Sequence, residues 1–596
     1  MFYENGNAAL PIEPLYDSIS PRAPHSRCLS ALLQKDIRSC LGIAQPLIAA
    51  NGGRTLNTLK TQDEVGNLTG YDDGTTSASY AYDANNRKTG ETVNYGPFAK
   101  SYAYTYTPNG QKATFTGPDG QIVRYGYDAN NQLNSIELPV GAMVVNSYAW
   151  RAPGKWTLPG GVTQERQYDP LLRPTGIRVR DQAGNTLIDY LYTYDDAGNI
   201  ATKQSEHGRY DYSYDALNRL VQADNPTLAD EAYTYDGVGN RTTDTNRPGA
   251  WNYSTGNRLT GIGSQTGFTY DANGSLVQKT DNGTTTDYQY NRENRLSRIS
   301  RNGSTVASYG YDPFGRRLWK EAGGQRIYFL YSEEGLVAEF DNSGTIIRAY
   351  GYESDGVWGT DPVYQKTGGQ YYFYQNDHLG TPQKLVGTNG AVVWSAKYRA
   401  FGEALLDGSY AVENPLRFPG QYYDSETGLH YNGRRYFDPL LGRFITSDPI
   451  GLDANTLNTY AYVDNNPINW FDPNGLEKRG RNRSRPRGPG VDTSACSYYS
   501  EACSKYGCGY YCYWAPLICR TADYNPLFKR DPTATTQNLN CVRKCLVRED
   551  KKKHDEKAAN CQDGCLTDEE IDAYHTDCFR ECGINPEIYP GVGIFN

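Results

Sequence analysis

A short tyrosine-aspartate repeat constrains the fold of this 596-residue chain more than any other feature. Aspartates that close successive copies lie 20 or 21 residues apart where the array is unbroken. The copies, of the form Tyr-x-Tyr-Asp with one Phe variant, are Tyr80–Asp83, Tyr125–Asp128, Tyr192–Asp195, Tyr212–Asp215, Tyr233–Asp236, Phe268–Asp271 and Tyr309–Asp312. A fixed period of this length predicts one supersecondary unit stacked many times, which cannot bury its apolar face alone.

Each repeat has the chemistry of a strand followed by a turn. Aromatic residues two apart lie on one face of a strand, and the Asp-x-x-Gly or Asp-x-x-Asn segment that follows supplies a side-chain-capped turn with a positive-φ position. A unit of about 20 residues is then two short strands and two turns. We therefore expect a mainly β fold, a spiralling antiparallel sheet that closes into a hollow shell to remove its edges.

The composition agrees with a repetitive shell better than with packed helices. Tyr accounts for 52 residues and Gly for 62, Met for only 2, and the mean hydropathy is -0.71. Tyrosine is rigid, favours strands and can line partly wet surfaces. No apolar run is long enough to span a bilayer, and no convincing signal peptide precedes the repeats.

The repeats resemble the tyrosine-aspartate (YD) repeats of Rhs proteins, which also occur in insecticidal toxin-complex C components and in teneurins. The resemblance covers about residues 55 to 476. Beyond the repeats, four sequence words in order resemble the Rhs repeat-associated core. They are Asp377-His378-Leu379-Gly380-Thr381-Pro382, Arg434-Arg435-Tyr436-Phe437-Asp438-Pro439, the run from Gly442 to Leu452, and Tyr460-Ala461-Tyr462 leading into Asn465-Asn466-Pro467. The closing Pro-x-x-x-x-Asp-Pro-x-Gly-Leu pattern runs from Pro467 to Leu476.

The resemblance implies a shell that encloses its own C-terminal segment and cuts the chain after the final leucine of that pattern, between Leu476 and Glu477. Asp448 and Asp472 each stand in an Asp-Pro-x-Gly-Leu word, and two close carboxylates can divide the acid and base roles because both cannot ionise easily. Arg443 is the candidate that orients a carboxylate or the scissile carbonyl. No cofactor or metal is needed for this reaction.

Structural interpretations of the same residues stay open at this stage. Asp-Pro with a nearby Gly is a common turn, and Asp312-Pro313 occurs in the repeats without any catalytic implication. An arginine on a turn is more often a solvated structural residue, and Arg443 is open to that interpretation. His378 lacks the neighbouring His, Cys or Glu of a metal site, and we interpret it as structural.

The chain after Leu476 is a different kind of sequence. A basic run rich in Arg, Gly and Pro leads into a tail that holds eleven of the 13 cysteines, from Cys496 to Cys582. Four cysteine pairs at four-residue spacing suit helices clipped by disulfides, with zinc as a less favoured alternative. We divide the chain into an irregular leader or truncated start (1–50), the repeat shell (51–370), the Rhs core with its self-cleaving junction (371–476), a basic linker (477–490) and a small cysteine-rich, partly helical effector domain (491–596).

These observations predict an Rhs-type polymorphic toxin for interbacterial competition. Its partners would be a cognate immunity protein, a secretion apparatus or N-terminal carrier half, and a target-cell surface, with no clear nucleic-acid binding. It would be cytoplasmic before delivery and secreted without a recognisable signal peptide. The alternative is a non-catalytic secreted or cell-surface protein that binds carbohydrate or other cells through its exposed aromatic residues. The sequence does not name the activity of residues 477–596.

Overall fold

The computed structural model describes residues 59–150, 152–354, 356–408, 410–451 and 457–480. The chain divides into two compact units, 1–482 and 483–596, and every described residue belongs to the first. The predicted leader, the cysteine-rich domain with its disulfides or zinc, and the basic linker beyond residue 480 lie outside the described residues. Within the described ranges no helix is long and apolar enough to cross a membrane.

The fold is mainly β and antiparallel, as predicted, with each strand paired to its neighbours in sequence. The first sheet has 18 strands. They are β1 (Leu59–Gln62), β2 (Leu68–Asp72), β3 (Ser77–Tyr82), β4 (Lys88–Asn94), β5 (Ala99–Tyr106), β6 (Lys112–Thr116), β7 (Ile122–Tyr127), β8 (Leu133–Leu138), β9 (Gly141–Ala149), β10 (Ala152–Thr157), β11 (Thr163–Tyr168), β12 (Pro174–Arg180), β13 (Thr186–Tyr194), β14 (Ile200–Ser205), β15 (Gly208–Tyr214), β16 (Leu220–Asp224), β17 (Glu231–Tyr235) and β18 (Arg241–Asp244).

A second sheet of 16 strands continues the same pattern, and a third of four strands follows it. The second comprises β19 (Trp251–Ser254), β20 (Arg258–Ile262), β21 (Thr266–Tyr270), β22 (Leu276–Asp281), β23 (Thr284–Tyr290), β24 (Leu296–Arg301), β25 (Ser304–Tyr311), β26 (Arg317–Ala322), β27 (Gln325–Tyr331), β28 (Leu336–Phe340), β29 (Ile346–Gly351), β30 (Tyr364–Thr367), β31 (Gln370–Asn376), β32 (Pro382–Gly387), β33 (Val392–Tyr398) and β34 (Ala404–Leu406). The third comprises β35 (Tyr422–Asp424), β36 (Leu429–Asn432), β37 (Arg435–Asp438) and β38 (Arg443–Phe444), and it is followed by the 3-10 turn η3 (Val463–Asn465).

The repeat is explained by two side chains at the end of each motif. The second tyrosine ends its strand and donates its hydroxyl to the carbonyl of the first residue of the preceding strand, as Tyr214 does to Ile200 at 2.9 Å and Tyr235 to Leu220 at 2.8 Å. The aspartate then caps the turn, because Asp236 Oδ1 accepts the backbone N–H groups of the residues two and four positions later. Each hairpin is therefore fixed to its neighbour by side-chain bonds as well as by strand pairing.

The motif also contains a β-bulge at the same place in successive copies. The register shifts at the second tyrosine in the pairs that end at Tyr82, Tyr127, Tyr194, Tyr214 and Tyr311, among others. A bulge bends the strand and increases its twist. Repeated at a fixed interval, it curves the sheet, and this is the curling that the sequence predicts.

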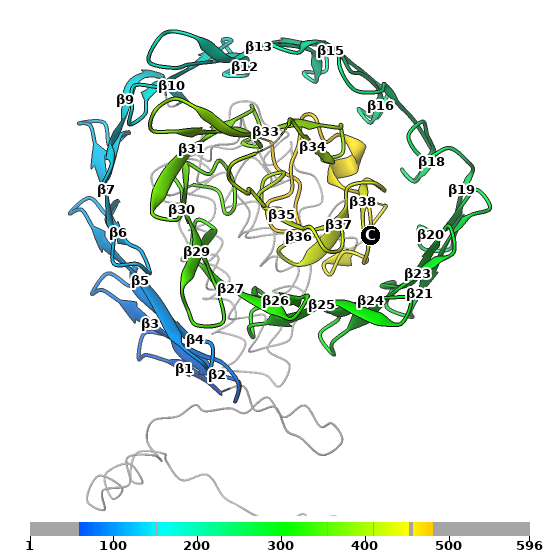
Figure 1. Cartoon of the computed structure of the whole chain (residues 1–596), viewed down its shortest axis with the longest axis horizontal. Helices are drawn as coiled ribbons and strands as arrows, with labels where there is room; N and C mark the ends of the chain where they lie inside the picture. The colour runs from blue at the N-terminus through cyan, green and yellow to red at the C-terminus, as the bar shows by residue number, and fades with distance from the viewer. Residues whose placement is uncertain (1–58, 151, 355, 409, 452–456, 481–596) are drawn as a thin grey trace, which may run out of the picture. The chain divides into compact units, whose positions relative to one another are not determined.

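The end of the second sheet packs on the concave side of the first. Figure 1 shows β27 to β33 inside the arc of β3 to β13. Tyr95 donates to the carbonyl of Phe329 at 2.8 Å, and Tyr104 to Glu334 at 2.6 Å. Between the two layers lies one core cluster rich in buried aromatic residues. The described strands include no pairing that joins β1 to β18 or β19 to β34, so the predicted closure of the sheet by hydrogen bonds is not found.

Candidate active site

The two predicted aspartates are brought together around an arginine that the sequence analysis did not select. Arg435 lies on β37, and its Nη2 atom is 2.8 Å from Asp448 Oδ2 and 3.5 Å from Asp472 Oδ2. The three side chains are buried, with 4% of Arg435, 7% of Asp448 and 3% of Asp472 exposed. Two carboxylates therefore share one cation inside the protein.

The remaining donors of Arg435 hold the backbone around this pair. Nε donates to the carbonyl of Gly475 at 2.6 Å and Nη1 to the carbonyl of Thr459 at 3.0 Å. The guanidinium also stacks 3.6 Å from the ring centre of Phe444 on β38. Arginine suits this position because its planar fork can serve several acceptors at once. Its contacts connect the third sheet, the Asp448 turn and the segment that ends at Leu476.

Asp472 is bonded directly to the predicted scissile peptide. Its Oδ1 atom accepts the N–H groups of Asn474 at 3.2 Å, Gly475 at 2.8 Å, Leu476 at 3.1 Å and Glu477 at 3.3 Å. The last of these is the nitrogen of the Leu476–Glu477 bond. The chain thus wraps around the carboxylate and places that bond within its reach.

The loop that carries the predicted scissile bond, residues 472–478, is closed by backbone hydrogen bonds between the residues that flank it. Phe471 and Arg479 exchange two backbone hydrogen bonds of 2.9 and 2.7 Å. Gly475 adopts φ +77°, and a β-carbon there would lie 2.3 Å from the carbonyl oxygen of Asn432. Only glycine fits this conformation so close to β36. The loop is therefore fixed relative to the third sheet rather than free in solution.

Burial sets the protonation of the two carboxylates. It raises the pKa of Asp472 to about 6, although Arg435 and the backbone N–H groups lower it. Burial also raises the pKa of Asp448 against the opposing effect of Arg435. Desolvation lowers the pKa of Arg435, whose guanidinium both aspartates help to keep charged. Carboxylates with raised pKa values near a reactive bond can exchange protons at mildly acid or neutral pH.

The other residues singled out in the sequence lie elsewhere. Arg443 donates from Nη2 to the carbonyl of Asn257 at 2.6 Å and stacks on Tyr460, with no ion pair to Asp448 or Asp472 among the described contacts. Adjacent residues of β38 point to opposite sides, so Phe444 faces Arg435 and Arg443 faces the repeats. His378 is bonded through Nε2 to the carbonyl of Ile468 at 2.7 Å.

A row of asparagines ties the segment that carries the aspartates to the repeat turns. Asn466 donates to Asn199 Oδ1 at 3.0 Å and to the carbonyl of Asn218 at 2.8 Å. Asn465 donates to the carbonyl of Gly239 at 2.9 Å. Three more side chains of the core segment continue this row. Asn458 donates to Asn240 Oδ1 at 2.9 Å, Arg443 donates to the carbonyl of Asn257 at 2.6 Å, and Tyr460 donates to the carbonyl of Gly274 at 2.7 Å. Successive turns of the shell thus bind successive points of the core segment.

Comparisons with known proteins agree with this architecture. Residues 44–149 and 160–468 match the family model described as Teneurin YD-shell. The chain is 29% identical over 358 residues to Double-stranded DNA deaminase toxin A of Burkholderia cenocepacia, covering 53% of this chain and 25% of that protein. It is 41% identical over 107 residues to Toxin protein Tse5 of Pseudomonas aeruginosa, covering 17% and 8%.

Solved structures show the same fold. The Tc holotoxin pore of Photorhabdus luminescens superposes with a TM-score of 0.57 at 19% identity, covering 72% of this chain and 25% of that one. This chain spans less than half the length of each of the three relatives described here. The family match, the repeats and the shared fold lead to one conclusion: the chain is an Rhs-type YD-repeat shell protein and belongs to the Teneurin YD-shell family.

Proposed function

We propose that the chain hydrolyses its own peptide bond between Leu476 and Glu477, with Asp448 and Asp472 as the acid and base. One observation carries the proposal. The carboxylate of Asp472 hydrogen-bonds the nitrogen of that bond and shares the Arg435 guanidinium with Asp448. Neither feature is needed for an ordinary Asp-Pro turn.

The reaction is an intramolecular peptide hydrolysis by water. Asp448, in its ionised form, takes a proton from a water molecule that attacks the carbonyl carbon of Leu476. Asp472, in its protonated form, gives a proton to the nitrogen of Glu477 as the C–N bond breaks. The products are the carboxylate of Leu476 and the amine of Glu477. Arg435 positions both carboxylates and the Gly475 carbonyl, which is the orienting role first assigned to Arg443.

Cleavage by itself does not free the downstream fragment in this proposal. Arg479 stays paired with the backbone of Phe471, and Lys478 forms an ion pair with Asp464 and lies 4.8 Å from the ring centre of Trp470. These contacts are made by residues on both sides of the cut. The new N-terminus therefore remains docked until the surrounding structure opens.

The wider role we propose is that of a toxin carrier whose C-terminal segment is the effector. It is supported by the relatives, two of which are named as toxins, and by the change of sequence character after Leu476. A cognate immunity protein and a delivery apparatus follow from that role, as does export from the cell that makes it. The activity of the effector is left open because the relatives differ in theirs.

The test is the mass of the purified chain under denaturing conditions. We expect a fragment that begins at Glu477 from the wild-type protein and none from Asp472→Asn or Asp448→Asn. Asp438→Asn is the matched control, because Asp438 is a buried aspartate before proline on β37, the strand that carries Arg435, and its Oδ1 caps the next turn. An uncut wild-type chain, or cutting that persists in both site variants, contradicts the proposal and favours a non-catalytic interaction protein.

A further inference from the structure

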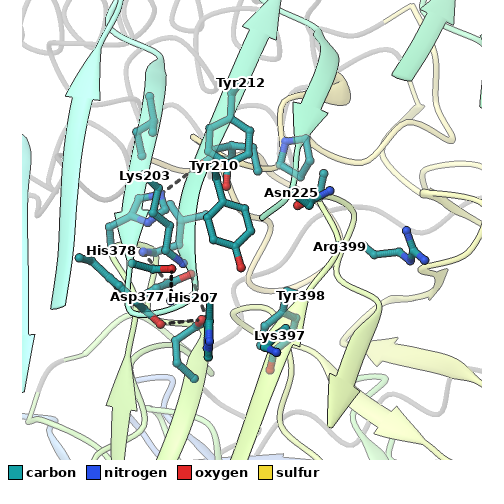
Figure 2. Close-up of a pocket in the computed structure, with 18 of the residues that line it drawn as sticks. Lys203, His207, Tyr210, Tyr212, Asn225, Asp377, His378, Lys397, Tyr398 and Arg399 are labelled. Atoms are coloured by element: carbon teal, nitrogen blue, oxygen red, sulfur yellow. Dashed lines mark hydrogen bonds between the residues drawn. The ribbon is translucent and has the colours of Figure 1, made fainter. Parts of the chain in front are cut away.

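A separate cavity of about 60 Å³ lies where the two layers and the core segment meet. It is formed by β13, β14 and β15 of the first sheet, by the turn after β31, by β33, and by Pro467 and Ile468. Figure 2 shows Tyr210 and Tyr212 entering from one side, Lys203, Asp377 and His378 on another, and Lys397 and Tyr398 opposite. A volume of this size holds a few water molecules or one small polar group.

Lys203 is the cation of this cavity whose contacts are unusual, because its ammonium group lies against aromatic rings. Its ammonium group lies 4.0 Å from the ring centre of Tyr190 and 5.3 Å from that of Tyr210. Among the described residues it forms no ion pair and no hydrogen bond. Burial lowers the pKa of Lys203, and the attraction of Asp377 and Glu206 only partly opposes this. Because this partly buried ammonium has no salt-bridge partner among the described residues, the cavity offers an unpaired cation to a negative group.

Tyrosine hydroxyls around Lys203 are also without partners. Tyr192 is 4% exposed, and its hydroxyl forms no hydrogen bond within the part of the chain that the structure describes. The same is true of the Tyr398 hydroxyl. Buried polar atoms are almost always satisfied in folded proteins. Two orphan hydroxyls and an unpaired ammonium beside one cavity therefore point to a molecule that would accept hydrogen bonds from them.

The other charged groups of the cavity already have salt-bridge or hydrogen-bond partners. Lys384 pairs with Glu206 at 2.8 Å, Lys397 with Asp407 at 3.1 Å and Arg399 with Glu403 at 2.9 Å. Oδ1 of Asp377 accepts three backbone N–H groups of its own turn at 2.9 to 3.1 Å. Lys203 is therefore the cation of the cavity that has no salt-bridge partner in the described part of the chain, while backbone N–H groups offset the charge of Asp377.

We propose that this cavity binds the anionic group of a small phosphate or carboxylate compound, with Lys203 as its charge partner and Tyr192 and Tyr398 as hydrogen-bond donors. Charge-assisted hydrogen bonds from an ammonium to an oxyanion are short and strong, and they would satisfy the lysine and both hydroxyls together. Tyr210 and Tyr212 supply aromatic walls beside the bound group. The site is distinct from the Asp448–Asp472 pair and does not depend on self-cleavage.

The experiment is isothermal titration of the purified full chain with inorganic phosphate and, separately, with acetate, in a buffer free of other oxyanions. We expect saturable binding with one site per chain for at least one of the two probes. Lys203→Met keeps the apolar stem and removes the charge, and it should weaken that binding at least about tenfold, as the loss of a charge-assisted bond predicts. Tyr398→Phe should weaken it about threefold, as the loss of one neutral bond predicts.

Arg209→Gln is the matched control. Arg209 lies on β15, is 61% exposed through its side chain and pairs with Asp211 at 2.6 Å, so its removal takes the same charge from the strand next to β14, which carries Lys203, without touching the cavity. Lys203→Arg keeps the charge and guards against a folding defect in the methionine variant. Retained binding in Lys203→Arg and Arg209→Gln supports the site. Absence of saturation with both probes, or equal binding by wild type and Lys203→Met, overturns it.

Discussion

The turns at Asp312 and Asp472 share the sequence word Asp-Pro-x-Gly and the same local fold, yet they differ in charge balance. In both, Oδ1 of the buried aspartate caps the turn by accepting backbone N–H groups. Oδ2 of Asp312 is bonded at 2.6 Å to Arg316, four residues later in the same turn. Among the described residues, Oδ2 of Asp472 pairs with Arg435 alone, at 3.5 Å, and the nearer partner of that arginine is Asp448.

This difference explains how one motif serves two purposes. Arg316 also pairs with Glu91 at 2.9 Å, but Glu91 is paired with Lys88 as well, so two cations serve two carboxylates at the structural turn. Arg435 is the one cation that pairs with both Asp448 and Asp472 among the described residues, and burial, which this arginine only partly opposes, raises the pKa of Asp472 to about 6. A reactive centre needs such an intermediate pKa, whereas a repeat turn does not. The same turn thus becomes a candidate catalytic centre when a single cation, supplied from another strand, serves two buried carboxylates.

The largest expected effect separates the two aspartates. Asp472→Asn should abolish cleavage, because an amide cannot donate or accept the transferred proton. Asp312→Asn should leave cleavage intact while it lowers the free energy of unfolding by about 3 kcal/mol, since Arg316 would lose its closest buried partner. Denaturing gels and urea unfolding measure the two outcomes. Loss of cleavage in a folded Asp312→Asn chain would contradict the distinction between structural and reactive turns.

The next effect concerns the arginines. Arg435→Gln should slow cleavage about 100-fold, the lower range for loss of acid–base catalysis, because two buried carboxylates would then compete for one proton. Arg316→Gln should leave the cleavage rate within about threefold of wild type once folding is complete. The rate is measured by diluting uncut chain from denaturant into native buffer and sampling the fragment over time. Equal rates in Arg435→Gln and wild type would remove Arg435 from the site.

The pH dependence gives a third, smaller effect. Asp472 must be protonated to act as the acid, and its pKa is raised to about 6. The cleavage rate should therefore be highest just below pH 6, fall toward a tenfold loss per unit above it, and fall again at lower pH as Asp448, whose pKa burial raises, takes up a proton. The same refolding assay in buffers from pH 5 to 8 measures the profile. A rate that increases steadily across this range would assign Asp472 as the base and Asp448 as the acid.

The sequence predicts the shell more completely than the site. Tyrosine alternation and the Asp-x-x-Gly turns give the hairpins directly, because both depend on residues close in the chain. The predicted closure of the sheet is not found among the described strands, where the edges and inner face of the array depend on long-range packing of β27–β33, which local periodicity does not encode. The family words located Asp448 and Asp472, and the structure brings them together.

The arginine of the pair illustrates what the sequence cannot decide. Arg435 stands beside Arg434 in a quoted core word and Arg443 lies a few residues on, so three arginines are equivalent candidates in one dimension. Their roles are separated by strand geometry. Arg435 faces the aspartates from β37, whereas Arg443 faces the repeats from β38. The position of each arginine on these two strands decides its role, and the Asp438-Pro439 turn between the strands does not by itself indicate which arginine faces the aspartates.

The smallest expected effect tests whether the shell positions the site. Asn466 bonds two repeat turns at once, through Asn199 and the carbonyl of Asn218, six residues before Asp472. Asn466→Ala should slow cleavage about tenfold, the equivalent of one or two net hydrogen bonds lost from the geometry of the reactive loop. Asn109→Ala is the control. Asn109 donates an exposed side-chain hydrogen bond to Asn131 in another repeat turn, and the described hydrogen bonds of the core segment do not involve either turn. This variant should leave the cleavage rate unchanged. Asn466→Gln keeps the amide donors, so partial rescue of the cleavage rate by that variant distinguishes positioning of the site from a general loss of stability. Equal slowing of cleavage in Asn466→Ala and Asn109→Ala would show that the row of asparagines stabilises the shell without aligning the aspartates.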